Sequence, residues 1–458
     1  MLRLALGVLW FVALPAGGYG SPAERGGYVM ADAYVRDQAS WKLSQSERPL
    51  WKAITTASGY HKADQYGGLL YVSALLYRYL DGESHQPLQM VVVTASISSL
   101  TLLFAWAFAR RVWGESVAKI ASWGLALYPE AVLLGSTQMR EAFLVTLITA
   151  AFYGLFRYSE RRSWGNLAWI LAPLLLSLLF SPPVAAVLVV FLVIQELVVE
   201  NGKVFHQRAL WLVLAVLVTL AIAGIWLAWR RLAPSGVSNP FALIVWWTKQ
   251  AISLQARASR LDSGWTQHIF RTVPQWLHLT LMMLYGIVRP LLPAALVDIS
   301  SAPIWRGIAI WRATGWTILL PFLIYAPFLA FRGFVSEKDR SVLIVRGLTI
   351  VVWLGIVAAS LRGGADLWDN PRYRVMFAGL QLMLAAWVWA TYRSTNDRWL
   401  SKTLVALGLV LIWFLPWYLR RYTGLEWPVV DFFKTLGLGV VSSALYFIWD
   451  WLKVIERA

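Results

Sequence analysis

Long apolar segments separated by short polar and basic stretches make up most of the chain. About a dozen of these segments contain roughly 17 to 25 residues, and each is long enough to cross a ~30 Å hydrocarbon core as a helix. The alternating polar and apolar pattern of a membrane β-strand is absent from the sequence. The pattern therefore predicts an all-α polytopic membrane protein with about twelve transmembrane helices, organised as a single transmembrane domain over residues 1–458.

The predicted spans begin with an apolar segment at Leu4–Gly20, which has features of a cleaved signal peptide but which we expect to be a retained span. Crossings are then expected near Leu88–Ala109, Val117–Leu133, Ala142–Phe156, Leu167–Phe180, Val184–Val199, Ala209–Trp229, Arg312–Phe331, Leu343–Leu361, Val375–Thr391, Thr403–Leu419 and Phe432–Trp451. The segment Trp276–Val297 contains the sequence RPLLP. We expect a re-entrant or interfacial pair of half-helices there.

Basic clusters at alternate turns indicate the orientation of these spans. They are Arg110–Arg111, Arg157 with Arg161–Arg162, and Lys203 with Arg208. The positive-inside bias places such clusters in the cytoplasm, so residues 21–87 form a first outer loop and residues 230–300 a second outer or interfacial region. Within the first loop, Leu69–Leu80 is apolar but short, and we expect a helix on the membrane surface. The protein is expected in the bacterial plasma membrane, with its active site outside.

The composition agrees with an all-α polytopic membrane protein. The sequence is 59% hydrophobic and 14% charged, and it contains no cysteine, which excludes disulfides and thiolate metal sites. The net charge of +17 comes from basic residues scattered at the predicted helix ends. This distribution favours anionic lipid headgroups, or an anionic lipid-linked substrate, over nucleic acid as the partner.

Ionisable side chains are concentrated between Met30 and Tyr77, beside the first apolar segment. Charge is costly near a membrane, so a polar cluster between spans is a candidate functional site. Asp32 is the candidate general base for an incoming hydroxyl or amine, since one carboxylate suffices when the leaving group is a stable phosphate. Arg36 lies four residues further on and shares a helix face with Asp32, so the two could form an ion pair. Arg36 is also a candidate substrate- or phosphate-binding residue. A solvated loop is the plain structural alternative.

A leaving phosphate requires cationic hydrogen-bond donors. Lys62 lies in the same loop, and Arg372 and Arg374 lie in WDNPRYR on the same predicted face of the membrane, with Tyr373 between them. Arginine suits this role because its planar fork donates two hydrogen bonds to phosphate oxygens. The alternative for WDNPRYR is a capped helix start, because Asn-Pro marks a turn.

Further acids are candidates for the same cavity: Asp37, Asp64, Glu130 and Glu141. Glu130 and Glu141 flank an outer turn, and a structural role is the favoured interpretation for them, because a carboxylate near a helix start interacts favourably with the helix dipole. A place in the cavity is the alternative. A divalent cation, Mg or Mn, is a possible cofactor with hard ligands in the first loop: Asp32, Asp37, His61 and Asp64. No phosphate-binding loop, serine nucleophile elbow or zinc-binding helix occurs in the sequence.

The order of these motifs resembles the membrane-integral GT-C glycosyltransferases, the class of the protein O-mannosyltransferases and aminoarabinose transferases. The similar pieces are ADAYVRDQA, HKADQYGGLLYVSALLYRYLDG, the block from ARRVWGES to MREAFLVTL, and DNPRYRVMFAGLQLMLAA. The resemblance implies a transferase that uses a polyprenyl-phosphate-linked sugar, with Asp32 as the catalytic aspartate, Lys62 as a phosphate-binding residue and Arg372 with Arg374 as the late basic pair. Departures are Ala33, where many relatives have Glu, and Ala63–Asp64 in place of prolines.

The favoured function is therefore a lipid-phosphate-sugar glycosyltransferase with a protein, lipid or glycan as acceptor. One alternative is a transporter or flippase of an anionic lipid-linked substrate, a class that usually shows internal repeats and ionisable residues at mid-membrane. Another is a surface-polysaccharide polymerase or ligase, or an inactive structural relative.

Overall fold

The computed structural model describes residues 1–54, 60–80, 84–200, 271–297, 301–332, 340–364, 369–395, 397–429 and 431–455, together with residue 366 and some positions between 215 and 246. Every regular element in these ranges is a helix. The predicted span Ala209–Trp229 and much of the second outer region lie outside the described residues, apart from those scattered positions.

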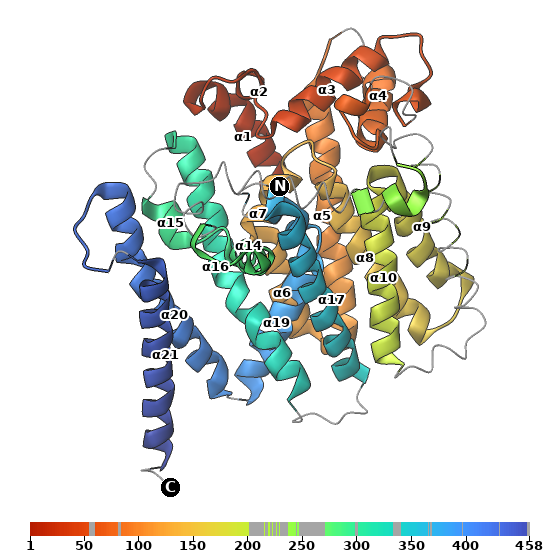
Figure 1. The fold of residues 1–458 in the computed structure, drawn as a ribbon. Helices are drawn as coiled ribbons and strands as arrows, with labels where there is room; N and C mark the ends of the chain where they lie inside the picture. Colours follow the sequence, from red (N-terminus) through yellow and green to blue (C-terminus); the bar gives the residue numbers. More distant parts are fainter. Residues whose placement is uncertain are drawn as a thin grey trace.

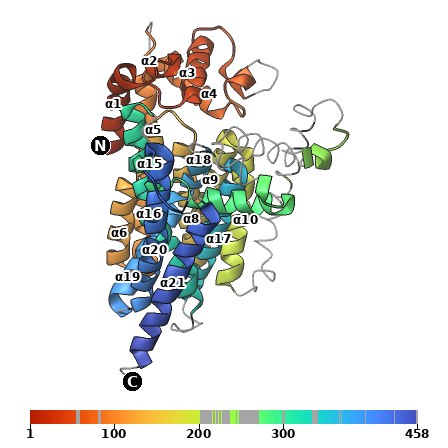
Figure 2. The same cartoon turned by 60° about the vertical axis from the view of Figure 1, so that its left-hand side comes forward.

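The N-terminal helices form a layer over one end of a bundle, at the top of Figures 1 and 2. The elements are α1 (Leu2–Gly17), α2 (Pro22–Arg25), α3 (Ala31–Ser44), the 3₁₀ turns η1 (Leu50–Ala53) and η3 (Tyr60–Lys62), and α4 (Gly68–Leu80). The helices α3 and α4 pack against each other. The expected short helix at Leu69–Leu80 is therefore present as α4, within this layer and not among the long helices.

The first half of the bundle consists of α5 (Pro87–Trp113), α6 (Glu115–Leu127), α7 (Pro129–Gly135), α8 (Glu141–Glu160), α9 (Trp164–Phe180) and α10 (Pro182–Val199). The central element is α8, most of whose residues are buried. Small residues permit close packing on two sides of it. A Cβ at Gly154 would lie 2.4 Å from the carbonyl oxygen of Trp169, and one at Gly379 would lie 2.2 Å from Thr149 Oγ1. Such close helix contacts are typical of membrane bundles.

The second half comprises η5 (Gln275–Leu277), α14 (His278–Val288), α15 (Leu292–Val297), α16 (Pro303–Phe331), α17 (Arg340–Gly363), α18 (Asp369–Val375), α19 (Ala378–Thr395), α20 (Arg398–Thr423) and α21 (Phe432–Ile455). The segment predicted as a pair of half-helices is divided into α14 and α15. The pair α20–α21 stands at the side of the bundle, where α20 packs on α15, α16 and α21 (Figure 1).

Seven described helices are long and apolar enough to cross a membrane, and nine if each of two bent pairs counts as one span. The protein is thus an all-helical integral membrane protein, and the count of twelve crossings stays a prediction. The helix α1 is shorter than the crossing expected at Leu4–Gly20, because its 16 residues rise about 24 Å at ~1.5 Å per residue, less than the ~30 Å core.

Two predicted straight spans are bent. Val117–Leu133 is the pair α6–α7, bent by 58°, and Val375–Thr391 falls on α18–α19, bent by 71°. Pro129 starts α7 directly after the extended residue Tyr128, and proline disfavours helical conformation in the residue before it. The second break brings the short polar helix α18 to the end of the bundle beneath the α3–α4 layer.

Candidate active site

Asp32 lies in the first turn of α3, where Met30 is the N-cap residue with an extended backbone. A carboxylate in the first turn interacts favourably with the helix dipole. The side chain of Asp32 is 62% exposed. The carboxylate is therefore accessible to a ligand at the end of the bundle.

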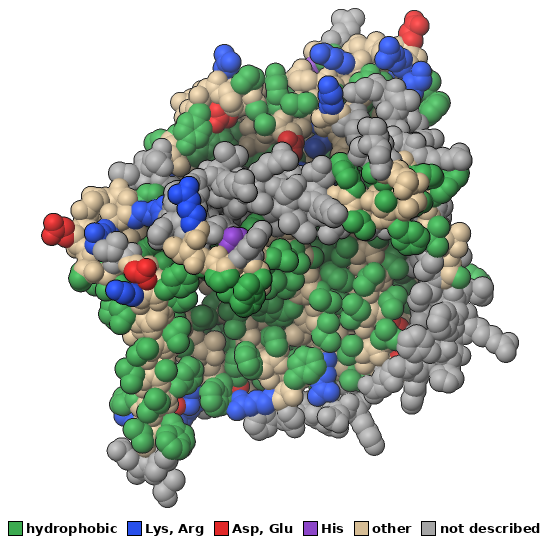
Figure 3. Space-filling view, viewed as in Figure 1, with side chains coloured by type: hydrophobic (Ala, Val, Ile, Leu, Met, Phe, Trp, Pro, Cys, Tyr) green, Lys and Arg blue, Asp and Glu red, His purple; other side chains and the backbone are tan. Residues whose placement is uncertain are grey.

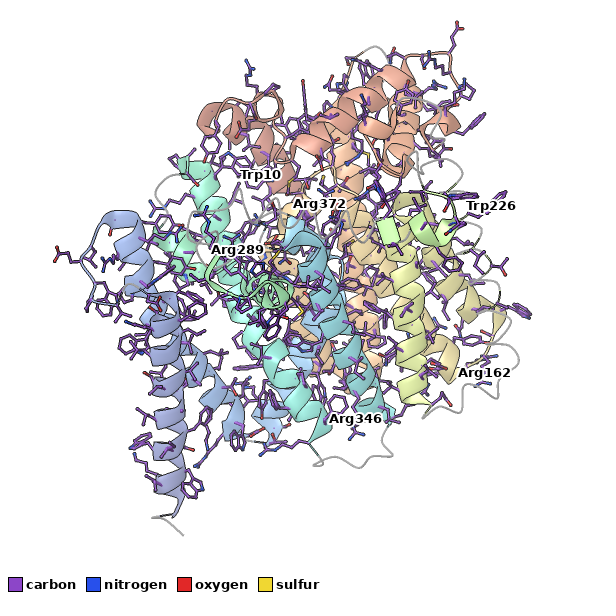
Figure 4. The ribbon with its side chains drawn as sticks, in the orientation of Figure 1. Trp10, Arg162, Trp226, Arg289, Arg346 and Arg372 are labelled. Carbon is purple, nitrogen blue, oxygen red and sulfur yellow. The ribbon has the colours of Figure 1, made fainter. Side chains whose placement is uncertain are left out.

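Arg372 of α18 joins Asp32 to Glu141, the first residue of α8. Its Nη1 donates to Asp32 Oδ2 at 3.1 Å, and its Nε donates to Glu141 Oε1 at 2.7 Å. The side chain of Glu141 is only 1% exposed. Arg372 lies beneath the α3–α4 layer in Figure 4, and acidic and basic side chains lie in a hollow there in Figure 3. A buried carboxylate thus fixes the guanidinium, and the guanidinium in turn orients the exposed carboxylate.

Two more arginines surround this group. Arg140 Nε lies 3.5 Å from Glu141 Oε1, and Arg36 Nε lies 3.6 Å from Asp64 Oδ2. Burial lowers the pKa of Arg36, although the carboxylates of Asp64 and Glu141 favour its charged form. Arginine remains protonated in proteins, so Arg36 and Arg140 add positive charge to the site.

The predicted ion pair between Asp32 and Arg36 is not observed among the described residues. Arg36 is directed toward Asp64, and Arg372, which is distant in sequence, pairs with Asp32 instead. Asp64 also accepts hydrogen bonds from the backbone N–H groups of Tyr66 and Leu70, at 3.3 and 3.1 Å. Asp64 therefore stabilises the start of α4 and anchors Arg36.

Two tyrosines accompany the cations of the site. The guanidinium carbon of Arg140 lies 5.0 Å from the ring centroid of Tyr66, and that of Arg362 lies 5.3 Å from the ring centroid of Tyr373. Burial raises the pKa of Tyr66. Tyr373 was a predicted site residue, whereas Tyr66 and Arg362 were not proposed from the sequence. Arg362 could have been found from the sequence, because it directly follows the predicted span Leu343–Leu361.

Two predicted phosphate ligands lie elsewhere. Lys62 is exposed on η3, and no hydrogen bond or ion pair joins it to Asp32 within the described part of the chain. Arg374 is completely buried, donates from Nη1 to the carbonyl oxygen of Arg289 at 2.8 Å, and lies 3.3 Å above the ring centroid of Trp316. This position favours a structural role for Arg374, because a phosphate cannot reach its guanidinium without displacing packed side chains.

The predicted cavity acid Asp37 faces the interior of the N-terminal layer. It accepts hydrogen bonds from the hydroxyl groups of Tyr28, at 2.5 Å, and Tyr77. His85 Nε2 lies 2.8 Å from Asp37 Oδ2. Asp37 thus ties α3 to α4 and to the segment before α5, away from the cluster around Asp32.

Glu130, near the start of α7, forms a buried ion pair with Arg312 of α16, with Oε1 and Nε 2.9 Å apart. Both side chains are almost inaccessible to solvent. A Glu130 carboxylate in this position holds α7 and α16 together, which agrees with the structural role favoured for it.

The acids of the first loop do not fit a divalent cation site. Among the described residues, no three His, Asp or Glu side chains gather as metal ligands. The oxygens of Asp37 accept tyrosine hydroxyl groups, and Asp64 is bonded to backbone N–H groups and paired with Arg36. The side chain of His61 lies outside the described part of the structure. We therefore derive no step through a metal ion.

Solved structures that are similar to this chain include two of ArnT from Cupriavidus metallidurans, each with 16% sequence identity. The match to the apo state covers 84% of this chain and 76% of that chain, with a TM-score of 0.35. The match to the form bound to undecaprenyl phosphate covers 97% and 88%, with a TM-score of 0.36. At these values the similarity carries no argument about activity. No family model matches the sequence, and no curated protein matches it.

Proposed function

We propose that this protein is an integral-membrane glycosyltransferase that moves a sugar from a polyprenyl-phosphate donor to an acceptor, with Asp32 as the general base. The observation that carries the proposal is the exposed Asp32 carboxylate, held by Arg372, which is itself fixed by the buried carboxylate of Glu141. The resemblance of the sequence motifs to GT-C glycosyltransferases supports the class of donor.

In the proposed reaction, Asp32 accepts the proton of an acceptor hydroxyl or amine as that group attacks the anomeric carbon of the sugar. The bond between the anomeric carbon and the phosphate oxygen breaks, and the phosphate leaves with the electron pair. Arg140, Arg362 and Arg372 are the candidate donors that stabilise this leaving charge. No general acid is required, since a phosphate leaves without being protonated.

The proposed site faces the outside of the cell. Arg162 and Arg346 lie near the end of the bundle opposite Arg372 (Figure 4). Basic clusters between spans favour the cytoplasm, which supports an extracytoplasmic position for Asp32. Labelling of a cysteine introduced at Lys62 by a membrane-impermeant reagent in intact cells tests this orientation, because the native chain has no cysteine. Labelling only after lysis would place the site inside.

The decisive experiment uses purified full-length protein in lipid nanodiscs with a panel of radiolabelled polyprenyl-phosphate hexoses and pentoses and a bacterial membrane extract as acceptor. Asp32→Asn should reduce transfer by about 10²- to 10⁴-fold, the usual contribution of a general base. Glu115→Gln is the matched control, because Glu115 is an exposed, arginine-paired carboxylate at the opposite end of α5. Unchanged transfer by Asp32→Asn would contradict the proposal, and counterflow of the donor without covalent product would favour a transporter.

A further inference from the structure

A cavity of about 590 Å³ lies beside the Asp32 cluster, and its wall comes from distant parts of the chain. Contributors are the segment between α1 and α3, the end of α14 with α15, the first turns of α16 and the last turns of α20. Met30 and Ala31, the residues directly before Asp32, belong to this wall. The volume is typical of a small-molecule site.

The wall of this cavity carries excess positive charge. Four arginines line it: Arg289, Arg306, Arg312 and Arg421. Glu24 is the acidic residue of the wall, and both of its oxygens already accept hydrogen bonds, from Trp305 Nε1 at 2.7 Å and the Ser21 N–H at 2.8 Å. Even with Arg312 neutralised by its buried partner Glu130, the arginines outnumber the acids. A cavity of this charge attracts an anion.

One arginine of the wall has an unsatisfied donor. Arg306 Nη2 donates to the carbonyl oxygen of Leu296 at 2.8 Å, which fixes the guanidinium. Its Nε is buried and has no hydrogen-bond partner among the described residues. A buried donor without a partner is costly, so the protein contacts of Arg306 leave part of its hydrogen-bonding capacity unused.

The rest of the wall is amphipathic. Aromatic side chains from all four contributing regions line the cavity: Tyr19, Tyr285, Trp305, Trp417, Tyr418 and Tyr422. Tyrosine and tryptophan combine an apolar ring with a polar group and are common at membrane interfaces. The surface is hollowed between the α20–α21 pair and the rest of the bundle (Figure 3), and the outer side of α20 is largely exposed. These features suit an amphiphile whose chains extend into the bilayer.

The cavity and the cations of the Asp32 cluster are joined through α18. From this short helix Arg372 is bonded to Asp32, whereas Arg374 is bonded to the backbone of Arg289, which lines the cavity. Two groups of cationic side chains therefore lie near Asp32. One is the group around Arg372, and the other is the set of arginines in the cavity wall. A displacement at an anomeric carbon brings the nucleophile from the face opposite the leaving group, so the acceptor and the donor phosphate occupy separate positions.

We propose, on the basis of the proposed function, that this cavity binds the anionic group of the acceptor, a membrane amphiphile carrying a phosphate or a carboxylate, and presents its nucleophile to Asp32. The donor phosphate then occupies the other region, near Arg140 and Arg362. The acceptor is thus an anionic lipid and not a protein.

The first test measures binding to purified full-length protein by native mass spectrometry with three probes: dioctanoyl phosphatidic acid, dioctanoylglycerol and inorganic phosphate. Phosphatidic acid should bind most tightly. Arg306→Gln and Arg421→Gln should each weaken its binding about tenfold or more, the effect of losing one charge-assisted contact. Arg398→Gln, at the exposed start of α20, is the matched control and should bind like wild type.

Several outcomes would overturn the proposal. Equal binding of dioctanoylglycerol would remove the need for an anionic group, and equal binding of inorganic phosphate would point to a soluble anion. Unchanged binding by both arginine variants would place the lipid elsewhere. The comparison among the three probes uses the wild-type chain, so it still tests the proposal if a variant fails to fold.

The second test identifies the product in cells that contain wild-type or Asp32→Asn protein, by mass spectrometry of extracted lipids and of proteins. The expected product is an additional sugar on phosphate- or carboxylate-bearing lipids in wild-type cells only. Sugar found only on protein, and dependent on Asp32, would refute the acceptor proposal and leave the proposed function intact. Products that are unchanged in Asp32→Asn cells would refute the proposed function, while the binding experiment still decides what the cavity holds.

Discussion

Replacing Glu141 by Gln removes the buried carboxylate that organises the candidate site. Glu141 lies 2.7 Å from Arg372 Nε and 3.5 Å from Arg140 Nε, and its side chain is 1% exposed. Glutamine has nearly the same shape and can still accept a hydrogen bond. Its neutral amide, however, leaves the two guanidinium groups without their shared counter-charge.

The size of the expected loss in stability follows from how deeply each carboxylate is buried. Removing one partner of a buried ion pair costs about 3–5 kcal/mol, because the other charge stays buried. An exposed pair contributes about 1 kcal/mol or less, and Asp32 is 62% exposed where it meets Arg372. Glu141→Gln should therefore destabilise the protein strongly, and Asp32→Asn only slightly. Transfer should fall in both variants, by up to about 10²-fold in Glu141→Gln, where Arg372 loses its position.

The assay compares unfolding in detergent by titration with denaturant, followed by circular dichroism, for wild type, Asp32→Asn, Glu141→Gln, Arg372→Met and the Glu141→Gln/Arg372→Met double variant. The double-mutant cycle should give a coupling of roughly 1–3 kcal/mol between Glu141 and Arg372. Equal destabilisation by Asp32→Asn and Glu141→Gln, or a coupling near zero, would refute the reasoning that the buried Glu141 carboxylate stabilises the fold more than the exposed Asp32 carboxylate does.

Three further predictions concern the surrounding structure. Glu130→Gln should destabilise the protein by about 3–5 kcal/mol, and the Glu130→Leu/Arg312→Met double variant should recover most of the loss in the same unfolding assay. Hydrogen bonds to Glu24 outweigh its burial and lower its pKa to about 2. Stability should therefore fall as the pH drops from about 4.5 toward 2, and a Glu24→Gln variant that keeps the full pH dependence would contradict this. Tyr77→Phe should weaken the N-terminal layer by about 1–3 kcal/mol, because Asp37 loses a buried hydrogen bond. Faster hydrogen exchange in α3 and α4 would show it.

The positions of most helices and the importance of the first loop could be predicted from the sequence, because both depend on local pattern. Apolar runs marked α5, α8, α10, α17 and α21 to within a few residues. The charged cluster after the first apolar segment was recognisable because ionisable groups are rare elsewhere in such a chain. Asp32 was a candidate on these grounds, and Arg372 was one because WDNPRYR lies on the same predicted face of the membrane. The structure brings the two side chains into contact.

The partners of each charge were decided only by the tertiary structure. Arg372 and Arg374 are two residues apart, yet one reaches Asp32 and the other is buried against Trp316, because residues two positions apart on the helix α18 point to different sides and meet different neighbours. The partner of Glu130 could not be predicted from the sequence either, since Arg312 is distant in the chain. Sequence patterns report which segments enter the membrane, since hydrophobic burial depends on composition. Ion pairs and cavities depend on which helices meet, and only the packed bundle determines that.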